Sequence, residues 1–171
     1  MSRINPEDVV DFYKSLENLG IKIWIDGGFS VDALLGEQTR KHLDLDIAIN
    51  QEDMVSLVRF LATEGYKEIR RDNEYNLVFG DKIGREIDIH AFISDKEGNI
   101  VGGIMYPTQS LTGLGTINGH LVRCISPEHM VKFLAQWVHK HPHKYLYVIS
   151  SLCQKFSIEY PKEYIDVKKL Y

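Results

Sequence analysis

The segment DLDIAI, from Asp44 to Ile49, constrains the fold more than any other part of the chain. Because side chains alternate along a strand, its leucine and isoleucines share one face, and Asp44 and Asp46 share the other. Two carboxylates about 6.6 Å apart along a strand repel each other unless positive charge lies between them. The segment therefore predicts a half-buried strand whose acidic face either binds a cation or lies in solvent at a sheet edge.

A glycine pair ahead of this strand predicts a turn from another strand into a helix. The segment IKIWI at 21–25 alternates like a strand, Gly27 and Gly28 follow it, and the next helix is expected to end near Gly36. Backbone N–H groups at the start of a helix bind phosphate readily. A basic stretch that begins at Arg40 then leads into the acidic strand, where it would neutralise a polyphosphate.

A second alternating segment, REIDIHAF at 85–92, places Glu86, Asp88 and His90 on one face of another expected strand. It offers a third carboxylate to the same site. Asp88 is flanked by two isoleucines, whereas Glu86 follows an arginine at a turn and suits a solvated ion pair. His90 either faces a second substrate or is a hydrogen-bonded sheet histidine, and both alternatives stay open.

The remaining periodicity predicts an α+β fold, with a small mixed β-sheet, flanking helices and a helical C-terminal section. Further strands are expected at 66–70 and 76–79, and a hairpin turn at 118–119. Helices are expected to begin after Asn5, near Asn50 to Asp53 and after Ser126, and a final helix is expected at 145–156. The length of 171 residues predicts a single domain, with its core at about 1–125 and the helical section at about 126–171.

The composition excludes several classes of protein. A net charge of −4 argues against a broad nucleic-acid surface, which needs a basic face. No apolar run approaches the length of a membrane span, and the first residues lack the apolar core of a signal peptide. We therefore expect a cytoplasmic protein with neither a nucleic acid nor a membrane as partner. Cys124 and Cys153 lack CxxC spacing and are expected to be reduced and partly buried.

Two further features are given structural interpretations. The histidines of HKHPH at 139–143 are expected in a loop between helices, because Pro142 interrupts the segment and no acid or cysteine accompanies them. Trp24 and Trp137 lie at spacings typical of core residues.

The segments WIDGGFSVDALLGEQTRKHLDLDIAI and EIDIH together resemble the nucleotidyltransferase superfamily that includes DNA polymerase beta. Within it, the chain resembles the small lincosamide and aminoglycoside adenylyltransferases, and GTINGHLVRCISPEHMVKF and LCQKFSIEYPKEY extend the resemblance over most of its length. The family pattern falls on Gly27, Gly28, Asp44, Asp46 and Asp88. It favours Asp88 over Glu86 as the third acid, because it requires the flanking isoleucines. Two departures are that a glycine replaces the usual serine of the glycine turn, and that HPHKYLYVISSLC lacks an aspartate that related enzymes carry.

The resemblance implies transfer of a nucleoside monophosphate to a hydroxyl of a small molecule, with release of pyrophosphate. The donor would be ATP or another NTP, and the acceptor a lincosamide, an aminoglycoside or another hydroxylated compound. Asp44 and Asp46 would hold one Mg²⁺, and Asp46 and Asp88 a second Mg²⁺ about 3.5–4 Å away. Asp88 would also be the base for the acceptor hydroxyl. A homodimer is expected by analogy with the family.

The same resemblance assigns the Gly27 and Gly28 amides to the β- and γ-phosphates, with Arg40 as their side-chain partner. Asp32 is expected to brace the basic loop, and His42 either orients the first acid of the strand or caps that strand. Two alternatives remain for the function as a whole. One is an adenylyltransferase of the toxin–antitoxin type that modifies a protein hydroxyl, and the other is a non-catalytic nucleotide-binding module, which the presence of all three acids disfavours.

Overall fold

The computed structural model describes residues 4–171. Residues 1–3 of the expected domain lie outside the described part. The helices are α1 Pro6–Asn18, α2 Gly27–Leu35, α3 Met54–Thr63, α4 Pro127–Ala135, α5 Pro142–Phe156 and α6 Lys162–Lys168. The strands are β1 Ile23–Ile25, β2 Asp44–Asn50, β3 Lys67–Arg71, β4 Asn76–Gly80, β5 Glu86–Ser94, β6 Ile100–Gly103, β7 Gly113–Ile117 and β8 His120–Cys124. This order confirms the predicted α+β fold.

The strands form one mixed sheet in the order β3-β4-β5-β2-β1-β8-β7, with β6 also paired to β5. Strand β2 is parallel to β5, and β1 is parallel to β8, while the other pairs are antiparallel. Because β2 lies between β5 and β1, it is a central strand. The alternative of an acidic face in solvent at a sheet edge is therefore wrong.

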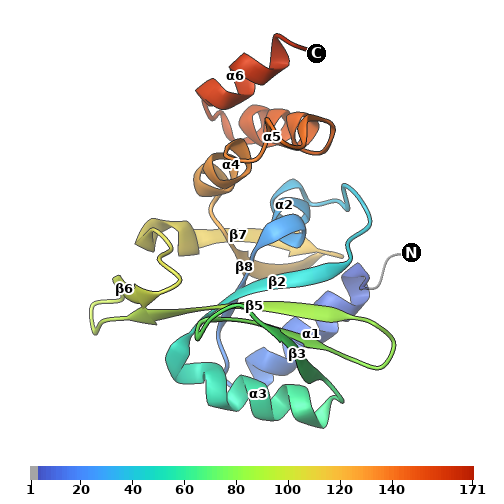
Figure 1. Cartoon of the computed structure of the whole chain (residues 1–171), viewed down its shortest axis with the longest axis vertical. Helices are drawn as coiled ribbons and strands as arrows, with labels where there is room; N and C mark the ends of the chain where they lie inside the picture. Colours follow the sequence, from blue (N-terminus) through green and yellow to red (C-terminus); the bar gives the residue numbers. More distant parts are fainter. Residues whose placement is uncertain (1–3) are drawn as a thin grey trace.

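The two faces of the sheet are covered by different helices (Figure 1). Helices α1 and α3 lie on one side of the sheet, and α2 with the C-terminal helices lies on the other. On β2, the side chains of Leu45, Ile47 and Ile49 are fully buried and belong to the main core, as their alternation predicts. Ala48, which alternation places on the face of Asp44 and Asp46, is also fully buried in this central strand.

Local sequence signals set several of the element ends as expected. The Asn5 side chain accepts a hydrogen bond from the Asp8 backbone N–H, and the Asp8 carboxylate accepts one from the Asn5 backbone N–H. Together they form the capping box that starts α1. Helix α2 ends at Gly36 in the left-handed conformation. Asn118 and Gly119 both have positive φ, so β7 and β8 are joined by the two-residue hairpin that these residues predict.

The helical section differs from the sequence prediction in three ways. Pro142 is the first residue of α5 rather than part of a loop, because the first turn of a helix needs no N–H from it. The helix expected to be the last is followed by α6. Trp137 lies beyond the end of α4 and is 49% exposed, so it is not a core residue.

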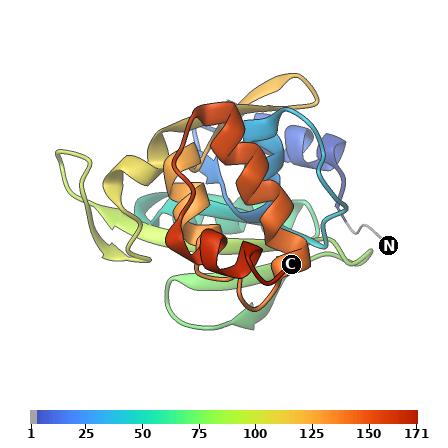
Figure 2. The ribbon, with the colours of Figure 1, turned by 90° about the horizontal axis from the view of Figure 1, so that it is seen from above.

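Viewed from above, helices α4, α5 and α6 lie over α2 and the sheet (Figure 2). The Lys155 side chain of α5 donates hydrogen bonds to the carbonyl oxygens of Leu34 and Leu35, at 2.8 and 3.0 Å. A cation at the C-terminal end of a helix is favourable, so this contact ties α5 to α2. Among residues 4–171, none of the helices combines the length and apolarity that crossing a bilayer requires.

Candidate active site

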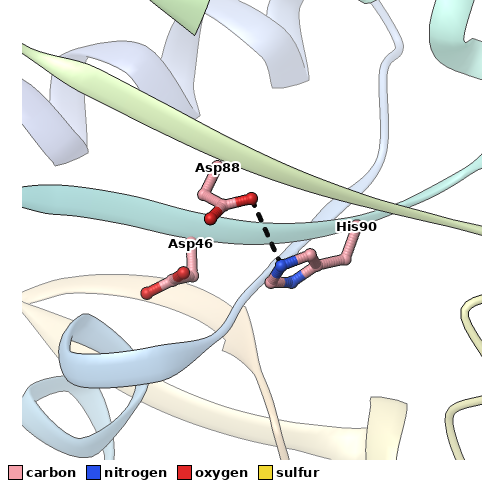
Figure 3. Close-up of side chains that lie close together, drawn as sticks. All are labelled: Asp46, Asp88 and His90. Carbon is pink, nitrogen blue, oxygen red and sulfur yellow. Dashed lines mark ion pairs between the residues drawn. The ribbon is translucent and has the colours of Figure 1, made fainter. Parts of the chain in front are cut away.

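The pairing of β2 with β5 places Asp46 directly beside Asp88. The two are register partners, and Asp44 is likewise opposite Glu86. Figure 3 shows Asp46 reaching from β2, and Asp88 and His90 from β5, on the same side of the sheet. One potential ligand atom from each of these three residues lies within 4.8 Å of the others. The acid cluster thus includes Asp88, whereas Glu86 lies opposite Asp44.

The carboxyl group of Asp46 is buried and lies among other acids. Burial raises its pKa to about 7, and the negative charges of Asp44, Asp26 and Asp88 act in the same direction. His90 opposes them in part. A positive charge beside Asp46 would therefore stabilise its ionised form, which is the electrostatic condition that a divalent cation satisfies.

Asp88 has the opposite character, because its neighbours stabilise its charge. Its Oδ1 accepts a hydrogen bond from Asn76 at 2.7 Å, and its Oδ2 lies 3.2 Å from the guanidinium of Arg70. Burial alone would raise the pKa of Asp88, but His90, Asn76 and Arg70 together hold that pKa below its ordinary value. Asp88 is therefore a fixed, ionised carboxylate.

A partly buried network joins His90 to the start of α2. The Tyr106 hydroxyl donates to Asp26 Oδ2 at 2.6 Å and lies 3.1 Å from His90 Nδ1, while His90 Nε2 lies 3.3 Å from Asp88 Oδ1. Burial favours the neutral imidazole, but Asp26 and Asp88 outweigh it and raise the pKa of His90 to about 10. His90 therefore has polar partners at both ring nitrogens.

The glycine turn fits closely against the acidic strand. Gly27 has φ +57°, and a Cβ built on it would lie 2.0 Å from Asp46 Oδ2. A Cβ on Gly28 would lie 2.3 Å from His42 Nδ1 and 2.9 Å from the Arg40 guanidinium. Only glycine allows these approaches. The Gly27 N–H donates to Asp26 Oδ1 at 2.7 Å, so it would have to leave that carboxylate to bind a phosphate.

A cavity of about 210 Å³ opens beside the turn. Its lining includes five of the six predicted site residues, namely Gly27, Gly28, Arg40, Asp44 and Asp46. Asp88 is not part of the lining, since it lies beside Asp46 on the neighbouring strand. Helices α4 and α5 cover the other side of the cavity with Leu134, Lys144, Tyr145 and Val148.

The basic loop between α2 and β2 is held by Asp32, as expected. Its Oδ1 accepts hydrogen bonds from the backbone N–H and the hydroxyl of Thr39, at 2.9 and 2.6 Å. Its Oδ2 lies 2.6 Å from His42 Nε2, and both side chains are almost fully buried. The His42 ring therefore points toward Asp32 and packs against Phe29, with ring centroids 4.2 Å apart.

Sequence reasoning missed several polar residues of the site. Asp26 could have been identified, because it stands at the N-cap of α2, where aspartate is favoured. Tyr106, Lys144 and Tyr145 belong to no recognisable pattern. Only the fold brings them to the site.

Comparison with protein-family models identifies the family of this chain. The model of the aminoglycoside-2″-adenylyltransferase family matches residues 8–144. This chain belongs to that family. It is therefore a nucleotidyltransferase of the adenylyltransferase type.

A curated lincosamide resistance protein of Staphylococcus haemolyticus is 37% identical over 51 residues, which are 30% of this chain and 32% of that protein. The match thus spans about a third of that relative's length.

Two solved structures share the fold of this nucleotidyltransferase. The lincosamide antibiotic adenylyltransferase LnuA, with lincomycin bound, has a TM-score of 0.74 and 21% identity, and the match covers 91% of this chain and 99% of that chain. ANT(2″)-Ia in complex with adenylyl-2″-tobramycin has a TM-score of 0.73 and 21% identity, with 88% of each chain covered. At these identities the likeness concerns the fold alone.

Proposed function

We propose that this protein transfers a nucleoside monophosphate from an NTP to a hydroxyl group of a small molecule and releases pyrophosphate. The observation that carries the proposal is the pairing of Asp46 with Asp88 beside the N-terminus of α2. The names of its relatives favour AMP as the transferred group and a lincosamide or aminoglycoside antibiotic as the acceptor.

The donor set fits a divalent cation. Carboxylates are the protein ligands that Mg²⁺ prefers, and a cation beside Asp46 would offset the burial and the neighbouring acids that raise the pKa of its carboxyl group. Asp44 and Asp46 would hold one Mg²⁺, and Asp46 with Asp88 a second. When bound, the metal would supply neutralisation of the charge on the triphosphate and the leaving group.

The cavity has the features needed to bind the triphosphate. The N-terminus of α2 carries partial positive charge, and Arg40 and Lys144 add a cation on each side of the cavity. Tyr145 offers an aromatic face next to Lys144. These residues would hold the phosphates so that the α-phosphorus faces Asp88.

Asp88 is the proposed general base. Its carboxylate would accept the proton of the acceptor hydroxyl, and the hydroxyl oxygen would form a bond to the α-phosphorus. The bond from that phosphorus to the pyrophosphate oxygen would break in line with the attack. Asn76 and Arg70 fix the Asp88 carboxylate for this step. Most of the catalysis would come from positioning and charge neutralisation.

Mass spectrometry of a pooled reaction tests the proposal. The pool would contain the protein, Mg²⁺, mixed NTPs, lincosamides, aminoglycosides and other small polyols, with the Asp88→Asn variant as control. A nucleoside monophosphate adduct on one acceptor, absent with the variant, would establish the reaction and identify both substrates. The absence of any adduct would count against a small-molecule acceptor of these classes.

A parallel reaction with cell lysate separates the two alternative functions. A nucleotide-dependent mass gain on a lysate protein would favour the protein-modifying enzyme. Nucleotide binding without transfer in either reaction would favour the non-catalytic module.

A further inference from the structure

His90 lies where a ligand of the metal centre would lie. Its Nε2 is 3.3 Å from Asp88 Oδ1, and one ligand atom each of Asp46, Asp88 and His90 lies within 4.8 Å of the other two. In an octahedral site with bonds of about 2.1 Å, neighbouring ligand atoms are about 3.0 Å apart. The spacing of Nε2 and Oδ1 is therefore close to that of two adjacent ligands around one ion.

The opposite side of the imidazole is held in the way that metal-binding histidines are usually held. His90 Nδ1 lies 3.1 Å from the Tyr106 hydroxyl, which in turn donates to Asp26 Oδ2. Nδ1 also lies 3.7 Å from Asp26 Oδ2 itself. Second-layer contacts of this kind orient the ring and leave the other nitrogen directed at the metal. Here that other nitrogen, Nε2, faces Asp88 and the acidic centre (Figure 3).

Nothing in the proposed reaction requires an imidazole at this point. Asp88 alone serves as the base, and Asn76 and Arg70 already fix its carboxylate. The contacts of Nδ1 with the Tyr106 hydroxyl and Asp26 leave Nε2 as the nitrogen of His90 that can face an ion between the two aspartates.

We propose that His90 is a ligand of the divalent ion held by Asp46 and Asp88, and that it makes this centre selective for a first-row transition ion, such as Mn²⁺, over Mg²⁺. The inference rests on the proposed function only for the presence of the metal centre. Mg²⁺ favours an all-oxygen shell, whereas first-row transition ions accept imidazole nitrogen and bind mixed nitrogen and oxygen sets more tightly.

Mn²⁺ alone, without NTP or acceptor, is the probe for the test. Electron spin echo measurements of the Mn²⁺-loaded protein detect nitrogen bound to the ion, and calorimetry gives the affinities for Mn²⁺ and Mg²⁺. We expect nitrogen coupling in the wild-type protein and its loss in His90→Gln. We also expect the Mn²⁺ affinity of His90→Gln to fall about tenfold or more, while its Mg²⁺ affinity changes by less than about threefold.

Two further variants separate ligation from a structural role. His139→Gln changes an exposed histidine outside the site and should leave both measurements unchanged. Tyr106→Phe keeps the imidazole but removes its anchor, so the nitrogen coupling should persist with weaker Mn²⁺ binding. Wild-type protein that binds Mn²⁺ without nitrogen coupling, or that does not bind Mn²⁺, would overturn the inference whatever the variants do.

The same experiment keeps this inference apart from the proposed function. Nitrogen coupling that depends on His90, together with no nucleotidyl transfer in the pooled reaction, would support the metal centre and reject the reaction. Nucleotidyl transfer without nitrogen coupling would support the reaction and reject His90 as a ligand of the metal ion.

Discussion

Asp46 and Asp88 are register partners on two neighbouring parallel strands, β2 and β5. Side chains at paired positions of adjacent strands point to the same side of a sheet, so this register brings together two acids that lie far apart in the chain. The same register places Ala48 opposite His90, which gives the imidazole room beside Asp88. The acidic centre is therefore a direct product of how β5 is inserted next to β2.

The base assignment predicts a specific kinetic defect. Asp88→Asn removes the proton acceptor but keeps a side chain of the same size, so nucleotide binding should persist while kcat falls about 10²–10⁴-fold. Steady-state kinetics with the acceptor found in the pooled reaction, together with calorimetry of nucleotide binding, measure the two effects. Glu86→Gln, on the same face of β5, is the matched control and should lose far less turnover. Full activity of Asp88→Asn would reject the assignment.

The glycine turn predicts a difference between two glycine substitutions. Gly27 and Gly65 both have positive φ, but a Cβ on Gly27 would collide with Asp46, whereas a Cβ on Gly65 would meet nothing within 4 Å. Both alanine variants should lose about 1–2 kcal/mol of folding free energy through backbone strain. Only Gly27→Ala should also lose metal and nucleotide binding. Thermal unfolding and binding calorimetry test this, and equal binding by the two variants would contradict the role of the turn.

The carboxyl group of Asp46 predicts how stability depends on pH without metal. Its pKa is about 7 in the folded protein and about 3.9 in the unfolded chain, so the folded state binds more protons between these values. The contribution of this group to the free energy of unfolding therefore falls as pH rises from about 4 to about 7, and is constant above that. Metal-free Asp46→Asn should exceed the wild type in stability by about 1–3 kcal/mol at pH about 8.

Thermal denaturation at a series of pH values measures this effect. The difference in Tm between Asp46→Asn and the wild type should shrink as pH falls below about 7, and should level off below about pH 3, where the carboxyl group is protonated in both states. Adding Mg²⁺ at neutral pH should raise the Tm of the wild type more than that of the variant. Parallel pH profiles for the two proteins would show that Asp46 has an ordinary pKa.

The cavity lining predicts a role for a lysine that the sequence did not single out. Lys144 lines the cavity with Arg40, so Lys144→Gln should raise KM for the NTP about tenfold, the equivalent of about 1.4 kcal/mol, with a smaller change in kcat. Lys140→Gln is the control, because that side chain packs over Trp137 and does not line the cavity. The same KM for both variants would exclude Lys144 from the NTP site.

Local signals predicted the parts of this site that are close in sequence. The alternation around Asp44 and Asp46, the glycine pair and the basic loop each have a short-range cause, and the structure gathers them around one cavity. The choice of Asp88 came from a resemblance, and the parallel register explains it. The bracing by Asp32 was also expected, and its bonds to Thr39 and His42 confirm it.

The missed features depend on packing between distant segments. Tyr106 reaches Asp26 and His90 only because the chain after β6 folds back over β5, and no periodicity encodes that path. Tyr145 contributes to the cavity because α5 packs on α2 through Lys155. The homodimer, the cytoplasmic location and the single domain remain predictions.

Labelled nucleotides test the central claim, nucleotidyl transfer to a hydroxyl, most directly. The protein would be incubated with the acceptor and with NTP labelled either in the α-phosphate or in the γ-phosphate, and the product would be separated from nucleotide and pyrophosphate. The account predicts that the α label moves to the acceptor and that the γ label appears in pyrophosphate, both absent with Asp88→Asn. A γ label on the acceptor would instead show phosphoryl transfer and would contradict the account.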